Sequence, residues 1–183
     1  EVSAQKYADL SDGGYGVSII NDCKYGHDIH NGTIMLSLFK SGAYPNPEAD
    51  QGEIKFVYSL CPHAGRLADS ETAKLAYYLN YPMTAVKASG DASLIPESFS
   101  AVTLDRDNVI CETIKESEDG NDTILRLYEF KNMKSHLSVK PGMKFEKAYL
   151  CDLSENELAE LKVEDGVIKT DISGFEILTI KLK

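Results

Sequence analysis

The sequence predicts an all-β fold, built as one β-sandwich or as two packed sandwich subdomains, with one short helix. Two features of the chain predict it. Apolar and polar side chains alternate over many short segments, which is typical of half-buried strands. Turn-forming Gly, Asn, Asp and Pro residues separate these segments, and many short strands joined by turns are typical of sandwiches.

Alternation is clearest in residues 33–39, 54–60 and 178–182. The apolar positions are Ile34, Leu36 and Leu38, then Ile54, Phe56, Tyr58 and Leu60, and finally Leu178, Ile180 and Leu182, which alternate with Thr179 and Lys181. Other strands are expected at residues 6–10, 15–20, 101–104, 108–115, 123–130, 145–150 and 166–170. Asn31-Gly32 and Asp165-Gly166 have the composition of two-residue hairpin loops.

One helix is expected after the residue 54–60 strand, because a cap, an apolar stripe and a terminating proline follow one another. The positions concerned are Asp69 or Ser70 for the cap, Leu75, Tyr78 and Leu79 for the stripe, and Pro82 for the end. A capping-box pattern, Ser154-x-x-Glu157, leaves residues 153–161 open between a second helix and a turn with a strand.

A polar stretch with Gly and Pro, residues 87–99, predicts a connection between two units. We therefore expect a first domain over residues 1–90 and a second, smaller sandwich subdomain over residues 97–183.

Composition and charge exclude several classes of protein. The 183-residue chain has a formal net charge of -10, which disfavours nucleic acid and anionic membranes as partners. No apolar run approaches a membrane span, and no signal peptide is present. We interpret the four cysteines as reduced thiols of a cytoplasmic protein, with disulfide pairing as the alternative. Because the first residue is Glu1, we expect a chain that was processed or cut from something longer.

Thiol and imidazole groups first suggest a metal site. Cys23, His27 and His30 are suitable zinc ligands, and Cys61-Pro62-His63 could add a fourth if the fold brings it close. The spacing matches no common zinc pattern, so a turn with solvent-facing histidines is the favoured interpretation.

A second cluster is acidic. Glu116, Glu118, Asp119 and Asp122 surround Gly120, but the residue order of an EF-hand calcium loop is absent. A solvated hairpin tip is the favoured interpretation.

The third candidate consists of two loops, residues 21–26 and 45–52, which are rich in Asn, Asp, Gln and Tyr. Such loops suit hydroxyl-rich ligands such as sugars, and ordinary turn chemistry explains them equally well.

Several sequence blocks resemble a known family. ADLSDGGYGVSIINDCKYGHDI at residues 8–29 is followed by YPNPEADQG at 44–52 and IKFVYSLCPH at 54–63, and GFEILTI lies at 174–180. In order and spacing these blocks resemble the C-terminal region of glycoside hydrolase family 38 α-mannosidases, most closely the cytosolic and bacterial branch. The resemblance is strong over residues 7–63 and thin in the middle of the chain.

The resemblance implies a function for a parent protein. The family cleaves terminal α-mannosides with retention through two carboxyl groups, and a zinc ion grips the sugar hydroxyls. These groups belong to an N-terminal α/β barrel, and the family's zinc-binding His-x-Asp motif is absent here. We therefore expect no catalytic residue, metal or cofactor in this chain and zinc in the catalytic domain of the parent. The expected partners are that barrel, in the same polypeptide, and the α-mannoside substrate.

The resemblance also implies a role for one turn. In the family, the turn at the NDCKYG position reaches the rim of the sugar pocket. It implies that Asn21, Asp22, Lys24 and Tyr25 lie at this rim or at the domain interface, with Lys24 and Tyr25 as hydrogen-bond donors. The alternative is that they only support the contact between domains.

Two other functions compete with this one. A free-standing carbohydrate-binding β-sandwich module often exposes aromatic side chains, and this chain has ten tyrosines but no tryptophan. A structural adhesion-type sandwich is disfavoured by the cysteine pattern and the missing signal peptide.

Overall fold

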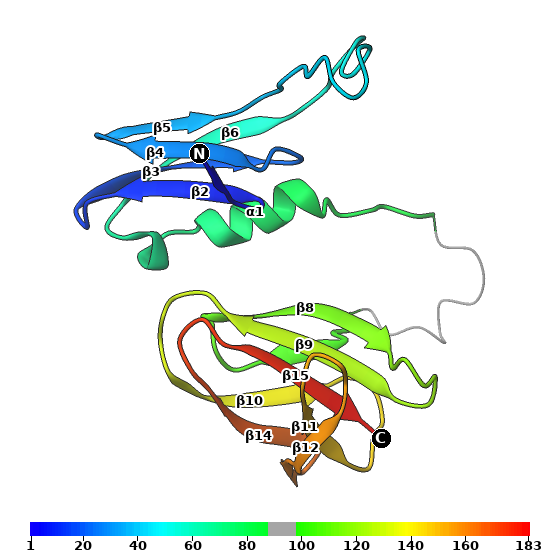
Figure 1. Cartoon of the computed structure of the whole chain (residues 1–183). Helices are drawn as coiled ribbons and strands as arrows, with labels where there is room; N and C mark the ends of the chain where they lie inside the picture. The colour runs from blue at the N-terminus through cyan, green and yellow to red at the C-terminus, as the bar shows by residue number, and fades with distance from the viewer. Residues whose placement is uncertain (88–97) are drawn as a thin grey trace. The chain divides into compact units, whose positions relative to one another are not determined.

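The computed structural model describes residues 1–87 and 98–183 of the chain (Figure 1). The chain divides into two compact units, Glu1–Lys87 and Ala88–Lys183. Strands dominate both units, and the described residues contain one α-helix, which confirms the predicted all-β class with one short helix. Most of the connection expected at residues 87–99 lies outside the described residues. No helix within the described ranges is long and apolar enough to cross a membrane.

The first unit consists of two antiparallel sheets and a helix. The elements are β1 (Val2–Ser3), β2 (Tyr7–Ser11), β3 (Tyr15–Asn21), β4 (Gly26–His30), β5 (Thr33–Leu36), β6 (Tyr58–Ala64), the 3-10 turn η1 (Leu67–Asp69) and α1 (Thr72–Asn80). One sheet has the order β2-β3-β6 and the other β1-β4-β5. Helix α1 contacts β3 and lies along the β2–β3 hairpin (Figure 1).

The hairpin between β4 and β5 confirms its predicted turn. His30 pairs with Thr33 across the two-residue loop Asn31-Gly32. Asn31 has φ 48° and Gly32 has φ 74°, the left-handed values that a type I′ turn requires. Asp165-Gly166 in the second unit also has the left-handed values that this turn requires, with φ 50° and 73°.

Helix α1 corrects one detail of the prediction and agrees with another. Its N-cap is Glu71, which makes no side-chain cap hydrogen bond, instead of Asp69 or Ser70. Its end at Asn80, before Pro82, agrees with the prediction.

The buried face of α1 also differs from the predicted stripe. The helix buries Thr72, Ala73 and Ala76, whereas Leu75 and Tyr78 are 42% and 67% exposed and Leu79 is half-buried. Small side chains allow α1 to lie close to the sheet, so the large apolar residues point away from it.

Strand β6 begins four residues later than the predicted strand 54–60. Tyr58 and Leu60 of the expected apolar face are exposed, while Cys61 and His63 are half-buried. Pairing with β3 explains this shift, because Cys61 lies opposite Ser18 and His63 opposite Gly16.

The second unit consists of two facing antiparallel sheets. Its strands are β7 (Val102–Leu104), β8 (Val109–Glu116), β9 (Thr123–Glu129), β10 (Ser135–Pro141), β11 (Ala148–Cys151), β12 (Glu157–Glu160), β13 (Lys162–Glu164), β14 (Val167–Ile172) and β15 (Ile177–Leu182). The four-stranded sheet has the order β13-β14-β10-β7, and the five-stranded sheet β12-β11-β15-β9-β8.

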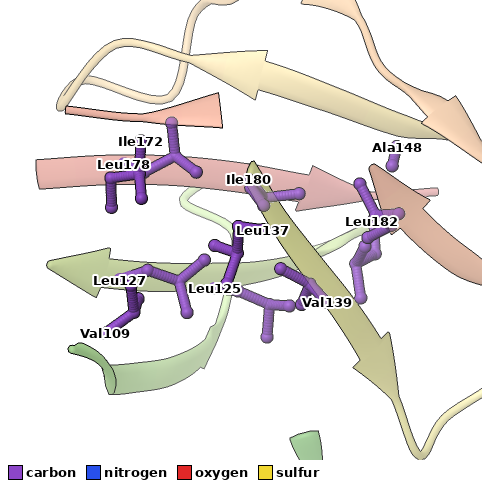
Figure 2. Packing of buried hydrophobic residues seen from close by; sticks show 11 residues of the cluster. Val109, Leu125, Leu127, Leu137, Val139, Ala148, Ile172, Leu178, Ile180 and Leu182 are labelled. Atoms are coloured by element: carbon purple, nitrogen blue, oxygen red, sulfur yellow. The ribbon is translucent and has the colours of Figure 1, made fainter. Parts of the chain in front are cut away.

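The core of this unit lies between the two sheets (Figure 2). The five-stranded sheet contributes Val109, Leu125, Leu127, Ala148, Leu178, Ile180 and Leu182, and the four-stranded sheet contributes Leu137, Val139, Ile168 and Ile172. Two sheets that share one apolar core form a β-sandwich.

Strand β15 buries both of its faces. Leu178, Ile180 and Leu182 enter the core as predicted, but Thr179 and Lys181 are also buried instead of facing solvent. The Lys181 ammonium lies 3.8 Å from the carboxylate of Glu157.

The open stretch 153–161 forms a turn followed by β12, so the capping-box pattern does not start a helix. Asp152 holds the turn by accepting hydrogen bonds from the backbone and side-chain amides of Asn156, at 2.9 and 3.0 Å. This local side-chain chemistry favours a turn over a helix.

Candidate functional site

The turn between β3 and β4 forms one wall of a pocket of about 170 Å³, called the β3–β4 pocket below. It is lined by Gln5, Lys6, Asn21, Asp22, Cys23, Lys24, Tyr25, Asn80 and Tyr81. The structure therefore brings the four predicted site residues together in one hollow, and their role stays a prediction.

Asn21 shapes the pocket from beneath, with only 1% of its surface exposed. Its Oδ1 accepts a hydrogen bond from the Lys24 amide at 2.6 Å, which closes the turn. Its backbone carbonyl accepts a hydrogen bond from Nδ2 of Asn80 at 3.0 Å, which ties the end of α1 to β3. The buried Nδ2 of Asn21 has no hydrogen-bond partner among the described residues.

Asp22 fixes the other side of the turn. Its backbone amide donates to Val57 O at 3.2 Å, and its Oδ1 accepts from the Val57 amide at 3.0 Å. The hydrogen bond from Cys23 and then that from Val57 lower the pKa of Asp22. The same carboxylate raises the pKa of the Cys23 thiol, which disfavours its thiolate form.

Two lysines, Lys6 and Lys24, are among the residues that line the pocket. Lys24 Nζ lies 5.3 Å from the ring centroid of Phe56, and Lys6 Nζ lies 4.6 Å from that of Tyr77. Aromatic faces stabilise cations at such distances. Tyr25, 54% exposed, also lines the pocket. The pocket can thus donate hydrogen bonds to hydroxyl or anionic oxygens of a ligand.

The structure separates the candidate zinc ligands. His27 is fully buried, with Nδ1 3.0 Å from Tyr25 O, and its Nε2 has no partner within the described ranges. His30 is exposed and lies 3.2 Å from Asp28. No three His, Cys, Asp or Glu side chains in residues 1–87 and 98–183 are placed to hold a metal ion. The described residues therefore do not fit the zinc ion that the resemblance implies for the family.

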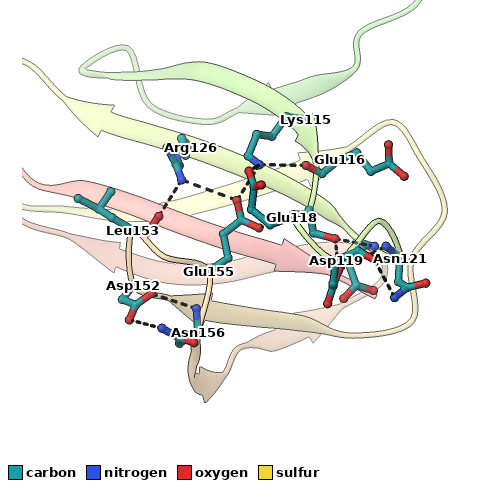
Figure 3. Close-up of polar contacts among 12 residues, drawn as sticks. Lys115, Glu116, Glu118, Asp119, Asn121, Arg126, Asp152, Leu153, Glu155 and Asn156 are labelled. Carbon is teal, nitrogen blue, oxygen red and sulfur yellow. Dashed lines mark hydrogen bonds and ion pairs between the residues drawn. The ribbon is translucent and has the colours of Figure 1, made fainter.

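The acidic cluster forms the tip of the β8–β9 hairpin, and its carboxylates have separate partners (Figure 3). Glu118 lies 2.7 Å from Lys115 Nζ, and Asp119 accepts hydrogen bonds from Ser117 Oγ at 2.5 Å and the Asn121 amide at 3.3 Å. These carboxylates organise the tip instead of converging on one point.

Glu155, 5% exposed, holds this tip against the turn that precedes β12 (Figure 3). It accepts a hydrogen bond from the Glu118 amide at 2.8 Å and lies 2.8 Å from Lys115 Nζ. The cluster is accordingly a structural element of the second unit.

A buried polar cluster in the first unit was missed from the sequence, and we call it the Asp9–His63 cluster. His63 Nε2 lies 2.8 Å from Asp9 Oδ1, and Ser18 Oγ donates to the same oxygen at 2.6 Å. Ser11 Oγ donates to Asp9 Oδ2 at 2.8 Å, and Ser18 Oγ lies 2.9 Å from Thr72 Oγ1 of α1. The cluster thus joins all three strands of one sheet to the helix.

Gly16 makes this arrangement possible. It lies on the central strand between Ser11 and His63, and the His63 ring crosses over it to reach Asp9. A Cβ atom at position 16 would lie 2.5 Å from His63 Cε1 and 2.6 Å from Ser11 Cβ. Only glycine leaves the required space, which gives the YGV segment a structural reason.

The contacts within the cluster favour the charged forms of both Asp9 and His63. Burial opposes ionisation of Asp9, but hydrogen bonds from Ser18, His63 and Ser11 outweigh it and lower the pKa of Asp9. The hydrogen bond to Asp9 raises the pKa of His63. Ser18 bonds to Asp9 and Thr72 and not to the imidazole, so the cluster lacks the serine–histidine contact of a nucleophilic triad.

The sequence contained a signal for the missed cluster. Polar residues or a thiol occupy every second position in two segments, at Asp9 and Ser11 and at Cys61 and His63. Asp9 and His63 are 54 residues apart, so their proximity follows only from strand pairing.

Comparison with family models places the chain in one family. Residues 1–48 match the model described as Glycosyl hydrolases family 38 C-terminal domain. Residues 108–180 match the Glycosyl hydrolases family 38 C-terminal beta sandwich domain, which agrees with the sandwich of the second unit.

Curated relatives extend the match across the chain. Alpha-mannosidase 2C1 of Homo sapiens is 33% identical over 187 residues, covering 100% of this chain and 18% of that protein. Alpha-mannosidase G of Dictyostelium discoideum is 36% identical over 132 residues, covering 70% of this chain and 12% of that protein. The Saccharomyces cerevisiae Alpha-mannosidase is 40% identical over 119 residues, covering 65% and 11%. The chain therefore spans less than a fifth of these relatives' length.

Solved structures from Enterococcus faecalis have the same fold. A protein in the Glycosyl Hydrolase Family 38 matches with a TM-score of 0.78 at 20% identity, covering 100% of this chain and 22% of that one. An alpha-mannosidase from strain V583 matches with a TM-score of 0.74 at 20% identity, covering 99% and 21%. The chain belongs to glycosyl hydrolase family 38 and corresponds to the C-terminal region of its members.

Proposed function

We propose that the chain is the non-catalytic C-terminal portion of a retaining α-mannosidase that hydrolyses terminal α-mannosides. The observation that carries the proposal is the match of the whole chain to alpha-mannosidase 2C1, of which it covers only 18%. The remaining length of such a protein is ample for a catalytic barrel, which would be the partner of this chain within the same polypeptide.

Two structural roles follow for the two units. Residues 1–90 would form part of the large C-terminal sandwich next to the barrel, and residues 97–183 a small C-terminal sandwich subdomain. Large apolar side chains on the first unit support a packing role, since Tyr15, Tyr58 and Leu60 are 59%, 52% and 65% exposed. Exposed apolar surface of this kind marks interaction sites.

The β3–β4 pocket would contribute to the rim of the sugar site. Lys24 and Tyr25 supply the donors, and the hydrogen bonds of Asn21 and Asp22 hold the turn that carries them. Ammonium and phenol groups can both donate hydrogen bonds to sugar hydroxyls. The competing role of the same residues is support of the interface with the barrel.

The chemistry itself belongs to the barrel. Retaining hydrolysis requires a carboxylate nucleophile and a carboxylic acid on either side of the glycosidic bond. In this proposal zinc is bound in the catalytic domain of the parent protein, as the family resemblance implies. All four cysteines are free, which supports a reducing, cytoplasmic location.

Kinetics of the complete natural polypeptide test the rim role. Lys24→Ala and Tyr25→Phe are compared with Lys55→Ala, which removes an 84% exposed lysine elsewhere in the unit. We expect kcat/KM for an α-mannoside to fall roughly tenfold or more in the pocket variants and to stay unchanged in the control. Unchanged efficiency with unchanged stability assigns the pocket to the domain interface instead.

The size of the natural gene product tests the larger proposal. An immunoblot of source cells should show a product several times heavier than the 20.2 kDa chain. A band at the size of the chain contradicts the hydrolase assignment.

Exposed tyrosines favour one second candidate, a free-standing carbohydrate-binding module. Tyr25, Tyr78 and Tyr81 are 54%, 67% and 61% exposed, and aromatic faces stack on sugars. Saturable binding of mannose or mannobiose by the isolated chain would support the module, and absence of binding supports the α-mannosidase assignment.

A further inference from the structure

We propose that Asp9 and His63 are positioning residues for the β3–β4 pocket, and that they act by seating helix α1 on the sheet β2-β3-β6. The inference rests on the proposed function, since the pocket is the part of the chain that would reach the sugar site. Neither residue lines the pocket, and α1 is hydrogen-bonded to the cluster through Thr72 and to the pocket turn through Asn80.

The beginning of α1 is attached to the sheet by a directed hydrogen bond. Ser18 donates its hydroxyl proton to Asp9 at 2.6 Å, so Thr72 is the donor in the 2.9 Å hydrogen bond between Ser18 and Thr72. The other acceptor near the Thr72 hydroxyl is Cys61 Sγ, which is weaker and lies farther away, at 3.9 Å. Ser18 and Thr72 are both fully buried. The carboxylate of Asp9 therefore fixes the direction of the bond that holds the first residue of α1 to the central strand.

The end of α1 is attached to the turn of the pocket. Asn80 Nδ2 donates to Asn21 O at 3.0 Å and to Ala76 O at 2.9 Å. Asn80 and Tyr81 are themselves pocket walls, facing the turn of Asn21. The same nine-residue helix thus connects the Asp9–His63 cluster at one end with the pocket at the other.

Between these two ends, the fully buried side chains of α1 are small, whereas Tyr77 and Leu79 are half-buried. The face that α1 buries is formed by Thr72, Ala73 and Ala76, which are small. Because apolar stabilisation scales with buried area, this face holds the helix weakly. Polar bonds at the two ends of α1 then decide how firmly it is seated, and their burial makes them sensitive to loss of a partner.

The protonation state of His63 affects the seating of α1 through the contact of its imidazole with Asp9. The carboxylate of Asp9 faces the imidazole and raises the pKa of His63 above 6.5. When the pH rises through that raised pKa, Asp9 loses its cationic partner and the seating of α1 weakens. The other titratable or charged groups on the surrounding elements are Tyr7 on β2, Tyr15 on β3, Tyr58 and Cys61 on β6, and Tyr77 and Tyr78 on α1. Two ion pairs at 3.1 Å lie on the same elements, one between Arg66, the N-cap of η1, and Asp69, and one between Glu71, the N-cap of α1, and Lys74.

Hydrogen exchange of the complete natural polypeptide, followed by mass spectrometry of its peptides, tests the proposal. The disrupting variants are His63→Gln and Thr72→Val, of which the second replaces only the hydroxyl with a methyl group. Thr72→Ser restores the hydroxyl, and His30→Gln removes a histidine from the exposed Asp28–His30 pair as a control.

We expect amides of residues 72–81 and 21–25 to exchange roughly tenfold faster in the two disrupting variants. Exchange should stay at the natural rate in Thr72→Ser and His30→Gln. After correction for intrinsic base-catalysed exchange, the natural protein should show a rise in α1 exchange as His63 deprotonates, and His63→Gln should lack this rise.

Unchanged exchange of residues 72–81 in both disrupting variants overturns the proposal. Faster exchange of the helix with unchanged exchange of residues 21–25 also overturns it, because the pocket is then independent of the helix. If His63→Gln does not fold, the comparison of Thr72→Val with Thr72→Ser decides alone. Unchanged kinetics of Lys24→Ala would refute the rim role while leaving the exchange result in place, so the two failures are distinguishable.

Discussion

The two units of the chain bury different kinds of side chain. The second unit buries a continuous cluster of Leu, Ile and Val from two facing sheets (Figure 2). The first unit buries mainly Ala8, Ile19, Ile20, Ala73 and Ala76 as apolar residues, and it exposes large ones such as Tyr58, Leu60 and Tyr78. A unit with small buried residues and large exposed ones depends on additional surface to complete its core.

Polar interactions fill part of this gap in the first unit. The Asp9–His63 cluster joins the sheet to α1, where the second unit has aliphatic packing between its layers. Buried polar groups of this kind favour one arrangement strongly but stabilise it little, because each bond replaces bonds to water. The first unit thus depends more on directed polar bonds between its layers, and the second more on apolar packing.

Separation of the units gives the largest expected effect. Residues 98–183 expressed alone should unfold in one cooperative thermal transition and remain monomeric, because their core is complete. Residues 1–87 expressed alone should lack a sharp transition and self-associate through the exposed apolar side chains. Circular dichroism melting and size-exclusion chromatography measure both properties. Cooperative, monomeric behaviour of residues 1–87 would show that the first unit needs no partner surface.

Truncation of one leucine or isoleucine in each unit sharpens the comparison. Ile180→Ala removes a fully buried side chain from the core of the second unit, and we expect it to lower the free energy of unfolding by about 2–5 kcal/mol. Leu60→Ala removes a 65% exposed side chain, and we expect about 0.5 kcal/mol or less in this chain. Denaturant unfolding of the 183-residue chain measures both changes. A large cost for Leu60→Ala would mean that its surface is already covered.

Gly14 and Gly16, at the start of β3, test the polar cluster at intermediate magnitude. A Cβ on Gly16 would meet His63 at 2.5 Å, whereas a Cβ on Gly14 would lie 3.6 Å from Asp12 Oδ1. We expect Gly16→Ala to destabilise the first unit by about 1–3 kcal/mol through this overlap. Gly14→Ala should be neutral or slightly stabilising, because ordinary van der Waals contact is available. Equal melting temperatures of the two variants would contradict the role of Gly16 as the crossing point of the imidazole ring.

Local signals were predictable from the sequence, and long-range pairing was not. The Asn31-Gly32 and Asp165-Gly166 turns contain their own φ requirements, so the hairpins could be predicted. Alternation over residues 54–60 did not fix which residues pair with β3, and the observed strand begins at Tyr58. The stripe of Leu75 and Tyr78 failed because periodicity cannot tell a face that meets a sheet from one that is left exposed.

The candidate site divides in the same way. The residues of the turn are close together in sequence, so a local motif was enough to single them out. The structure shows that Asn21, Asp22, Lys24 and Tyr25 line one pocket. The partnership of Asp9 with His63 needs the three-strand register, which no single segment contains.

The smallest expected effect is a difference in how the two units respond to pH. In the second unit, burial disfavours the charge of Glu129, but hydrogen bonds from the Phe175 amide and Asn108 outweigh it and lower the pKa of Glu129 below 4.5. Its contribution to stability is therefore present above pH 4.5 and is lost as the pH falls through the lowered pKa.

In the first unit the sign is opposite for His63. Its pKa is raised above 6.5, so its contribution is complete below pH 6.5 and is lost as the pH rises through the raised pKa. As the pH rises above 6.5 we therefore expect exchange protection to decline by a small factor in the first unit and to stay constant in the second. Asp28→Asn, in an exposed pair of the same two residue types, should leave this profile unchanged because solvent screens such pairs. A decline of equal size in both units, or one that His63→Gln does not abolish, would mean that the imidazole of His63 is not the group that titrates. A decline that is confined to the first unit and removed by His63→Gln ties the difference between the units to one buried ion pair.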